Sequence, residues 1–429
     1  MNRVSTKQID WSLVVRRGDH IVCSHMTSEP VALLHSLADS GVHDGCFQVF
    51  LGVPFSSAGT YFSRNTGFKV FGGMGSAGAL ARTHKTLVSM QHYSQCQQAF
   101  VSGAERADVV LVELARSTDG NLYLGAAHGY VLEAARRARC IVAEVNAAAP
   151  AVCGAPWPGD LDIDVMVETD YPLAQPAAMG ISEVERRIAG HVSPLVLPGA
   201  CLQVGIGSLP SAVLEGLNAH RHLGLHSGML TPALWRLIER GVIDNSSKAI
   251  DAGVSVTGCV YGEASLYAAV HSNTAFSLRP PSYTHAAATI AQLSRFTAIN
   301  SALEVDLMGQ MNAEAVLTSG GALRQVGGVG GLNDFVRAAR HAAQGLAVVA
   351  LPSRQVTRDA TTGAPRIVAA LSGPATIAAS DADVIVTEYG VAHLRNATLD
   401  ERARALIAIA HPDDRDALFA AARRSGQIS

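Results

Sequence analysis

The sequence predicts an α/β fold made of two similar domains, each built on an open parallel sheet flanked by helices. Short apolar runs that end in Gly or Asp alternate with longer helical patterns, which is typical of strand–helix–strand units. The apolar runs are continuous and rich in β-branched residues, as in strands covered on both faces. The chain has 429 residues, too many for one compact core, so two domains are expected.

The clearest strand candidates are the apolar runs at residues 20–24, 109–114, 140–145, 201–206, 346–351 and 384–388. Pro30 and Pro210 stand where helices should begin, and proline is tolerated there because that N–H would lack a partner anyway. A last helix is predicted to begin at a capping box formed by Thr398 and Glu401. Residues 353–365 are polar and rich in turn formers, which predicts a surface hairpin or loop.

A weak internal repeat supports two similar halves. Residues 17–37 and 198–217 share the order glycine turn, strand, loop and proline-started helix, and residues 138–146 are echoed by 382–390. Any two strand–helix units look alike, so either match alone would carry little weight, whereas two matches in the same order favour a repeat. The predicted domains are 1–190 and 191–429.

The composition excludes several classes of protein. Lys and Arg number 33 and Asp and Glu 36, a net charge of −3 without a basic block, so no nucleic-acid partner is expected. The N-terminus lacks an apolar signal region and no run is long enough to span a membrane, so we expect a soluble, cytoplasmic protein. Seven scattered cysteines without a C-x-x-C pair suggest neither a disulfide framework nor a metal site.

Two glycine-rich turns are candidates for ligand binding. Gly205 and Gly207 follow a predicted strand and precede a helix, an arrangement that exposes backbone N–H groups to a phosphate or a developing oxyanion. Glycine at such a turn often serves packing alone. A second set of glycines, which would let the backbone approach a bulky ligand, comprises Gly327, Gly328, Gly330 and Gly331.

Several segments resemble the acetyl-CoA hydrolase/transferase family, the class I CoA-transferases typified by 4-hydroxybutyrate CoA-transferase. The most specific are I-N-S-A-L-E-V-D-L-M-G-Q-M-N (299–312), G-V-G-G-L-N-D-F-V-R (328–337) and V-T-E-Y-G-V-A-H-L-R (386–395). H-M-T-S-E-P (25–30) is similar to the family's A-H-x-x-x-E-P. Residues 45–105 depart from the family, and that region shapes the acyl pocket in relatives, so the resemblance does not identify the acyl group.

The resemblance implies that coenzyme A binds as a substrate, not as a tightly held cofactor, at the seam between the halves. The implied CoA contacts are the four glycines of the second turn together with Tyr389, Gly390 and Ala392. The implied acyl pocket contains Met26, Ser227, Gly228 and Met229. The catalytic candidates are His25, Gly205, Gly207, His226 and Glu263. A small acceptor and a homodimer or higher homo-oligomer are also expected.

The nucleophile of the family is missing. In relatives the stretch L-G-L-H-S-G-M (223–229) ends H-S-E-M or H-T-E-M, and the glutamate forms an acyl anhydride and then an enzyme-CoA thioester. Here Gly228 stands at that position. A glycine supplies no carboxylate, so transfer requires a carboxylate from elsewhere.

Three glutamates are candidate replacements for this nucleophile. Glu263 is an acidic residue where relatives carry Thr or Ser, although it can equally be a solvated loop residue. Glu304 and Glu29 match residues found in relatives that also have the usual nucleophile, which favours structural roles for both. Glu29 can simply stabilise the dipole of the helix that Pro30 begins.

The residues left in the stretch offer another mechanism. His226 can act as a general base toward water or another nucleophile, while Ser227 is expected to cap a helix. Three functions therefore remain open: CoA transfer or thioester hydrolysis, a repurposed acyl-CoA enzyme such as an acyltransferase or decarboxylase, and an inactive CoA-binding protein.

Overall fold

The computed structural model describes residues 2–3, 5–177, 180–318, 320–355 and 363–428. The chain forms two compact units, which we call unit 1 and unit 2. Unit 1 comprises Met1–Pro176, Gly228–Pro232 and Val254–Thr284; unit 2 comprises Ala177–Ser227, Ala233–Gly253 and His285–Ser429. The units thus interleave in sequence, since two segments from the second half of the chain join unit 1. The division at residues 190 and 191 stays a prediction about the two halves.

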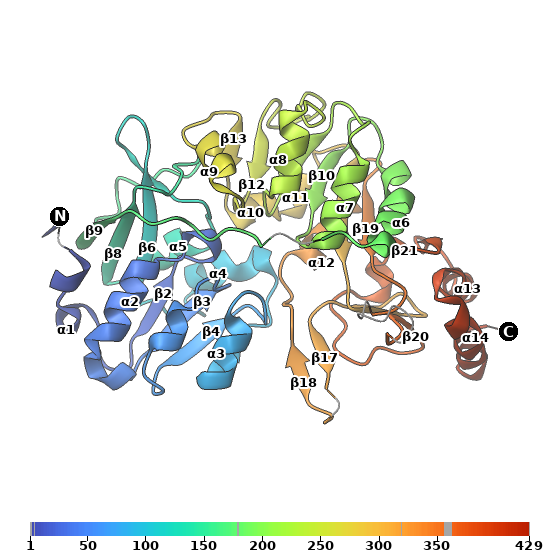
Figure 1. The fold of residues 1–429 in the computed structure, drawn as a ribbon, viewed down its shortest axis with the longest axis horizontal. Coiled ribbons are helices and arrows are strands. Elements are labelled where there is room, and N and C mark those ends of the chain that lie inside the picture. Colours follow the sequence, from blue (N-terminus) through green and yellow to red (C-terminus); the bar gives the residue numbers. More distant parts are fainter. Residues whose placement is uncertain (1, 4, 178–179, 319, 356–362, 429) are drawn as a thin grey trace. The chain divides into compact units, whose positions relative to one another are not determined.

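Unit 1 is built on a parallel sheet in the order β1-β9-β8-β6-β2-β3-β4-β5, with β7 antiparallel to β6 (Figure 1). The strands are β1 (Asn2–Arg3), β2 (His20–Cys23), β3 (Gln48–Gly52), β4 (Gly67–Val70), β5 (Thr86–Val88), β6 (Val109–Arg116), β7 (Leu122–Leu124), β8 (Cys140–Asn146) and β9 (Val165–Thr169). Unit 1 also holds the parallel pair β12 (Ser255–Thr257) and β13 (Phe276–Leu278).

Helices cover this sheet. They are α1 (Trp11–Val14), α2 (Val31–Ser40), α3 (Ala77–Thr83), α4 (Cys96–Ser102) and α5 (Val131–Ala135), and the later segment adds α9 (Ala264–Val270) and α10 (Pro281–Thr284). One apolar core joins the central strands to α2, with Val49 and Leu111 among its sheet residues and Leu33 and Leu34 from the helix. Burial of both sheet faces explains why β6 reads as a continuous apolar run.

Unit 2 contains a second sheet in the order β11-β10-β14-β19-β21-β22, parallel except for the final antiparallel pair. The strands are β10 (Cys201–Val204), β11 (Gly224–Ser227), β14 (Phe296–Ser301), β19 (Leu346–Ala350), β21 (Val384–Thr387) and β22 (Gly390–His393). Short strands outside it are β15 (Glu304–Asp306), β16 (Met311–Asn312), β17 (Ala315–Leu317), β18 (Leu323–Gln325) and β20 (Ile367–Val368).

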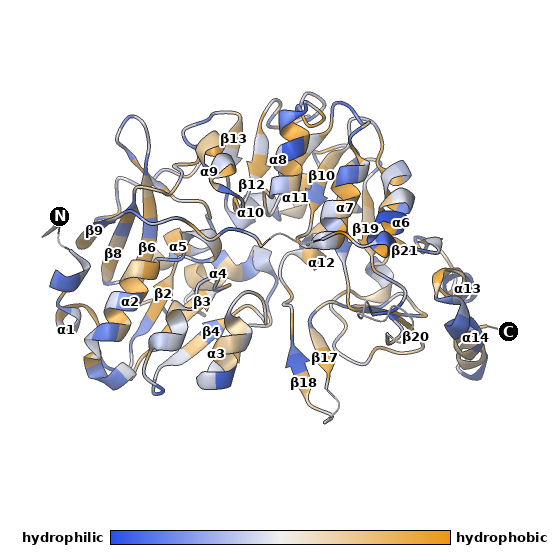
Figure 2. Ribbon diagram, in the orientation of Figure 1, coloured by the Kyte–Doolittle hydropathy of each residue, from blue (hydrophilic) through white to orange (hydrophobic). Residues whose placement is uncertain are grey.

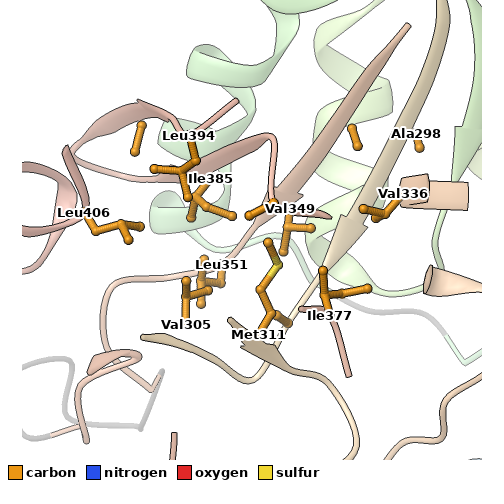
Figure 3. Packing of buried hydrophobic residues seen from close by; sticks show 14 of the residues in the cluster. Ala298, Val305, Met311, Val336, Val349, Leu351, Ile377, Ile385, Leu394 and Leu406 are labelled. Carbon is orange, nitrogen blue, oxygen red and sulfur yellow. The ribbon is translucent and has the colours of Figure 1, made fainter. Parts of the chain in front are cut away.

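The helices of unit 2 surround an apolar core. They are α6 (Glu183–Val192), α7 (Ser208–Gly216), α8 (Pro232–Glu239, whose first residue belongs to unit 1), α11 (Ala287–Ile290), α12 (Leu332–Ala339), α13 (Leu399–Ile409) and α14 (Arg415–Arg424). Val336, Val349, Ile385 and Leu406 bring α12, two strands and α13 into one cluster (Figure 3). The helices α6 and α7 each carry hydrophobic and hydrophilic residues, as expected for helices that pack one face on the apolar core (Figure 2).

The structure confirms the predicted fold class and the predicted strands. Both proline-started helices form, with Pro30 as the N-cap of α2 and Pro210 in the first turn of α7. The capping box of Thr398 and Glu401 opens α13 as predicted. The predicted loop at 353–365 falls largely on residues 356–362, which lie outside the described residues. All seven cysteines are free. No helix in the described part of the chain is long and apolar enough to cross a membrane.

Candidate active site

The first glycine turn joins β10 to α7 in unit 2. Gly207 is the N-cap of α7 with φ 126°, a conformation that favours glycine. The N–H of Gly205 donates to Ile299 O over 2.9 Å and is therefore already used by the sheet. The donors left for an oxyanion are the N–H groups of the first turn of α7, which have no partner within the helix. Ile206 between the glycines is exposed, so ligands can reach this turn.

A buried amide pair supports the turn. Gln203 Nε2 donates to Asn300 Oδ1 over 3.1 Å, and Asn300 Nδ2 donates to Gln203 Oε1 over 2.8 Å. A Cβ at Gly205 would lie 3.1 Å from Asn300 Oδ1, tighter than most such contacts. Gly205 therefore lets the turn sit directly on this pair, and its predicted role becomes one of close packing.

His226 and Ser227 lie on β11, beside β10. Both side chains are fully buried. Ser227 Oγ is 3.5 Å from both the N and the O of Val204. The expectation that Ser227 caps a helix is wrong, because the residue belongs to a strand and the next helix begins only at Pro232.

The second glycine turn, which contains Gly331, packs against His285, and His285 lies near His226. Burial, with a smaller contribution from nearby His226, lowers the pKa of His285 to about 3, so its imidazole is neutral. A Cβ at Gly331 would overlap the His285 ring, which packs against Phe335 with 4.3 Å between ring centroids. Unit 2 therefore places the Gly331 turn directly against a histidine that neighbours His226.

Two other glycines of this turn, Gly327 and Gly330, also stand where a side chain would be unfavourable. The N–H groups of Val326 and Gly327 both donate to Glu314 O over 2.8 Å. A Cβ at Gly327 would overlap Ala313 O, and Gly330 has φ 54°. Gly328 stays a predicted ligand contact. The turn ends at the N-terminus of α12, where Gly331 is the N-cap.

The predicted CoA loop near residue 390 also lies in unit 2. The Tyr389 ring has the guanidinium carbons of Arg187 and Arg415 each 5.6 Å from its centroid, and His411 meets it edge-on. Gly390 has φ 141° at the start of β22. Ala392 is 1% exposed and belongs to the apolar core, so its side chain faces the core rather than a ligand.

His25 lies in unit 1 inside an aromatic shell. It is 1% exposed, and its Nε2 is 3.0 Å from Tyr93 Oη. A Cβ at Gly52, which has φ 61°, would lie 2.8 Å from His25 Nδ1. Burial, followed by nearby His128, lowers the pKa of His25 to about 3, so the ring is neutral at physiological pH. His25 is thus packed inside unit 1, and its catalytic role stays a prediction.

Met26 and Gly228 are brought into the same region of unit 1. Met26 is half-buried and has φ 55°, a strained conformation for a side chain with a Cβ. The next residue, Thr27, donates through Oγ1 to Val260 O over 2.9 Å. Leu230 forms a bridge with Val260, and a Cβ at Gly258 would lie 3.0 Å from Gly228 O. Residues 258–260 therefore link the two predicted pocket positions.

The predicted carboxylates differ in their surroundings. Glu263 is the exposed N-cap of α9, and its side chain makes no capping hydrogen bond. Glu304 is buried and accepts hydrogen bonds from Asn312 Nδ2 and from Ser372 and Gly373, which confirms a structural role. Glu29 is also buried, and it accepts from the N–H groups of Phe55 and Ser56 instead of acting on the helix dipole.

Sequence reasoning missed His128 and Arg279, which lie beside Gly228 in unit 1. His128 N donates to Gly258 O over 3.0 Å, and Arg279 N donates to Thr257 O over 2.8 Å. Neither residue lies in a motif of its own, and they are 151 positions apart (279 minus 128). Only the pairing of residues 126–128 with 258–260 brings them together.

Comparisons with known proteins find relatives of this chain. The family described as acetyl-CoA hydrolase/transferase C-terminal domain matches residues 262–422. The sequence is 36% identical to the 4-hydroxybutyrate coenzyme A transferase of Clostridium kluyveri over 315 residues, 73% of this chain and 71% of that protein.

Solved structures share the fold over nearly the whole chain. RipA from Yersinia pestis superposes with a TM-score of 0.88 at 28% identity, covering 99% of this chain and 98% of RipA. A 4-hydroxybutyrate CoA-transferase from Porphyromonas gingivalis gives a TM-score of 0.80 at 29% identity, covering 99% and 97%.

Proposed function

Because the chain belongs to the acetyl-CoA hydrolase/transferase family, we propose that this enzyme transfers coenzyme A between carboxylates or hydrolyses acyl-CoA thioesters. The observation that carries the proposal is the packing of the Gly331 turn on His285 beside His226, in the same unit as the turn at Gly207. One turn offers backbone for a bulky ligand, and the other offers N–H donors for the oxyanion of a thioester under attack.

Gly228 limits how transfer can proceed. One path uses Glu263 in place of the missing nucleophile, with a glutamyl-CoA intermediate as in relatives. The other path is direct. A carboxylate oxygen of the acceptor attacks the thioester carbon, the C–S bond breaks and CoA leaves as thiolate. The thiolate then attacks the acceptor carbon of the mixed anhydride, which forms a new thioester and releases the donor acid. Hydrolysis replaces the acceptor with water, and His226 is the base that we propose for it.

A trapping experiment separates the two paths. The protein is incubated with acetyl-CoA, treated with borohydride and analysed by peptide mass spectrometry. A reduced Glu263 peptide that disappears in Glu263→Gln, but not in Glu239→Gln on the exposed end of α8, establishes the glutamyl path. Turnover without any modified glutamate establishes the direct path. Absence of turnover with every acyl-CoA and carboxylate tried would overturn the proposal.

The role of His226 has its own test. His226→Ala should reduce thioester cleavage while the Kd for CoA changes little, because the base acts on the nucleophile and not on the nucleotide. Unchanged cleavage would remove His226 from the mechanism. His226→Gln, which keeps a hydrogen-bonding side chain of similar size, controls for collapse of this fully buried position.

A further inference from the structure

Arg279 is unusual among the charged residues of the described chain. It follows β13 in unit 1 and is half-buried, and its Nε is the only lysine or arginine nitrogen among the described residues that is buried without a hydrogen-bond partner. Its guanidinium carbon lies 5.3 Å from the centre of the Tyr283 ring, which accounts for one face of the group. No hydrogen bond or ion pair of its side chain occurs among the described residues.

An unpaired guanidinium in such a place is costly. Arginine stays charged at every physiological pH and has five N–H donors but no acceptor. Folded proteins normally give a buried charge a partner, because its removal from water is repaid only by a counter-charge or by hydrogen bonds. The residues that the structure describes supply no partner for the buried Nε of Arg279, so the partner is expected to be a ligand.

The surroundings of Arg279 point to the reacting end of the substrate. Gly258 lies between the backbones of Arg279 and Gly228, since a Cβ there would be 3.0 Å from Gly228 O and 3.8 Å from Arg279 O. The guanidinium acts electrostatically on His128, and Gly228 supplies no side chain to this group of residues. His128, whose N–H donates to Gly258 O, completes the group.

His128 does not compete for an anion. Burial lowers the pKa of His128 to about 4, and Arg279 adds a smaller effect in the same direction. The imidazole is therefore neutral at pH 7. Its Nδ1–H donates to Gly129 O over 3.3 Å, which leaves Nε2 as an acceptor without a charge of its own. Arg279 remains the one fixed positive charge in this group of residues.

We propose that Arg279 binds a carboxylate group of the substrate near Gly228. A planar guanidinium fits a carboxylate in a two-point hydrogen bond. The phosphates of CoA are a poorer match, because the pantetheine arm separates them from the reacting thioester. The carboxylate can belong to a free acid acceptor or to the acyl chain of a dicarboxylic acyl-CoA. The site rests on Arg279 itself, while the identity of the substrate rests on the proposed function.

Binding measurements test this assignment without relying on turnover. Ligand-observed NMR gives the affinities of acetate, succinate and inorganic phosphate, and calorimetry gives those of acetyl-CoA, succinyl-CoA and free CoA. Arg279→Gln should weaken binding of a carboxylate at least about tenfold, equivalent to about 1.4 kcal/mol. Arg279→Lys should retain part of it. Arg136→Gln, which removes an exposed arginine paired with Asp160 in the same unit, should change nothing.

The ligands separate the two sources of the carboxylate. Weaker acetate and succinate binding assigns the site to the acceptor, whereas a loss confined to succinyl-CoA, with acetyl-CoA and CoA unchanged, assigns it to the acyl chain. Unchanged affinities in Arg279→Gln overturn the proposal, as does an equal loss for phosphate. Thermal unfolding checks folding, and Arg279→Gln without ligand should be at least as stable as the wild type because an unpaired charge is removed.

The outcome is distinguishable from failure of the proposed function. If Arg279→Gln loses the carboxylate but the wild type turns over no acyl-CoA, the site stands and the proposed function fails. If turnover occurs while carboxylate affinity is unaffected by the substitution, the proposed function stands and the site fails.

Discussion

At the scale of single residues, the proposed ligand binding depends on glycines. Gly331 and Gly327 are held so closely against His285 and Ala313 that any side chain would overlap them. Gly228 is different, since its importance lies in the carboxylate that it does not supply. Gly331 and Gly327 are therefore proposed to let the backbone approach a ligand, whereas Gly228 affects which group can serve as the nucleophile.

Gly331→Ala should weaken CoA binding. The new methyl group would overlap the His285 ring and displace the turn that is proposed to contact CoA, so an affinity loss of about tenfold, or about 1.4 kcal/mol, is expected. Calorimetry with free CoA measures it. Gly320→Ala, where a Cβ meets nothing within 4 Å, is the matched control. Equal CoA affinity in both variants would show that this turn does not hold the ligand.

Buried carboxyl groups are the other informative single residues. Burial, with repulsion from Glu144, raises the pKa of Glu113 well above its ordinary value, while hydrogen bonds from Asn146 and Tyr171 oppose the rise. Glu29 lies nearby, and its pKa is also raised by burial. No positively charged group contributes to these shifts, so the neutral form of the Glu113 carboxyl is favoured in the folded protein relative to an exposed glutamate.

Glu113→Gln should therefore flatten the pH dependence of stability. Because the folded pKa lies above the unfolded one, the folded state keeps a proton that the unfolded state releases as pH rises above about 4.5. The contribution of Glu113 to the free energy of unfolding is therefore largest below that pH. As the pH rises toward the folded pKa, this contribution falls by up to about 1.4 kcal/mol per pH unit. Urea unfolding between pH 4 and 8 measures the slope. The exposed Glu183→Gln is the control, and identical slopes in wild type and Glu113→Gln would contradict the prediction.

At the scale of elements, local sequence signals determine where helices and strands begin. The capping box of α13 was readable because both partners lie within three residues. The long apolar run of β6 was readable because both faces of that strand are buried. The expected cap at Ser227 was wrong because nothing local distinguishes a serine that ends a strand from one that begins a helix.

Thr398→Ala should destabilise α13. The substitution removes the hydroxyl that accepts from Glu401 N and leaves that N–H without its cap, at a cost of about 1 kcal/mol. Chemical denaturation measures the change, and Thr398→Ser, which keeps the hydroxyl, should retain most of the stability. A loss of the same size in both variants would mean that the methyl group, not the cap, matters.

At the scale of the whole molecule, the sequence predicted two similar parallel-sheet halves but not how the chain interleaves. Segment Val254–Thr284 joins unit 1 through pairings with residues 126–128 and 27, more than a hundred positions away, and segment Gly228–Pro232 pairs in turn with residues 259–261. Periodicity and turn signals describe neighbours in sequence, so they do not encode such pairings. Arg279 and His128 were missed for this reason, whereas the glycine turns were found because each is local.

The resemblance identified the ligand more securely than the reaction. The sequence and the fold are those of the acetyl-CoA hydrolase/transferase family. The proposed nucleophile, base and acceptor depend on Gly228 and its neighbours, where the resemblance predicts a glycine at the position of the family's glutamate. Glu263 is the candidate nucleophile, His226 the candidate base and Arg279 the candidate carboxylate-binding residue, and each has a separate test.

The most direct test of the account is mass-resolved turnover. The purified protein is mixed with acetyl-CoA or succinyl-CoA and a second free carboxylic acid, and all CoA species are quantified over time. The account predicts a new acyl-CoA, or free CoA where hydrolysis prevails, at a rate that falls in Gly331→Ala and not in Gly320→Ala. Intact acyl-CoA in every mixture, or turnover equally fast in both variants, would contradict it.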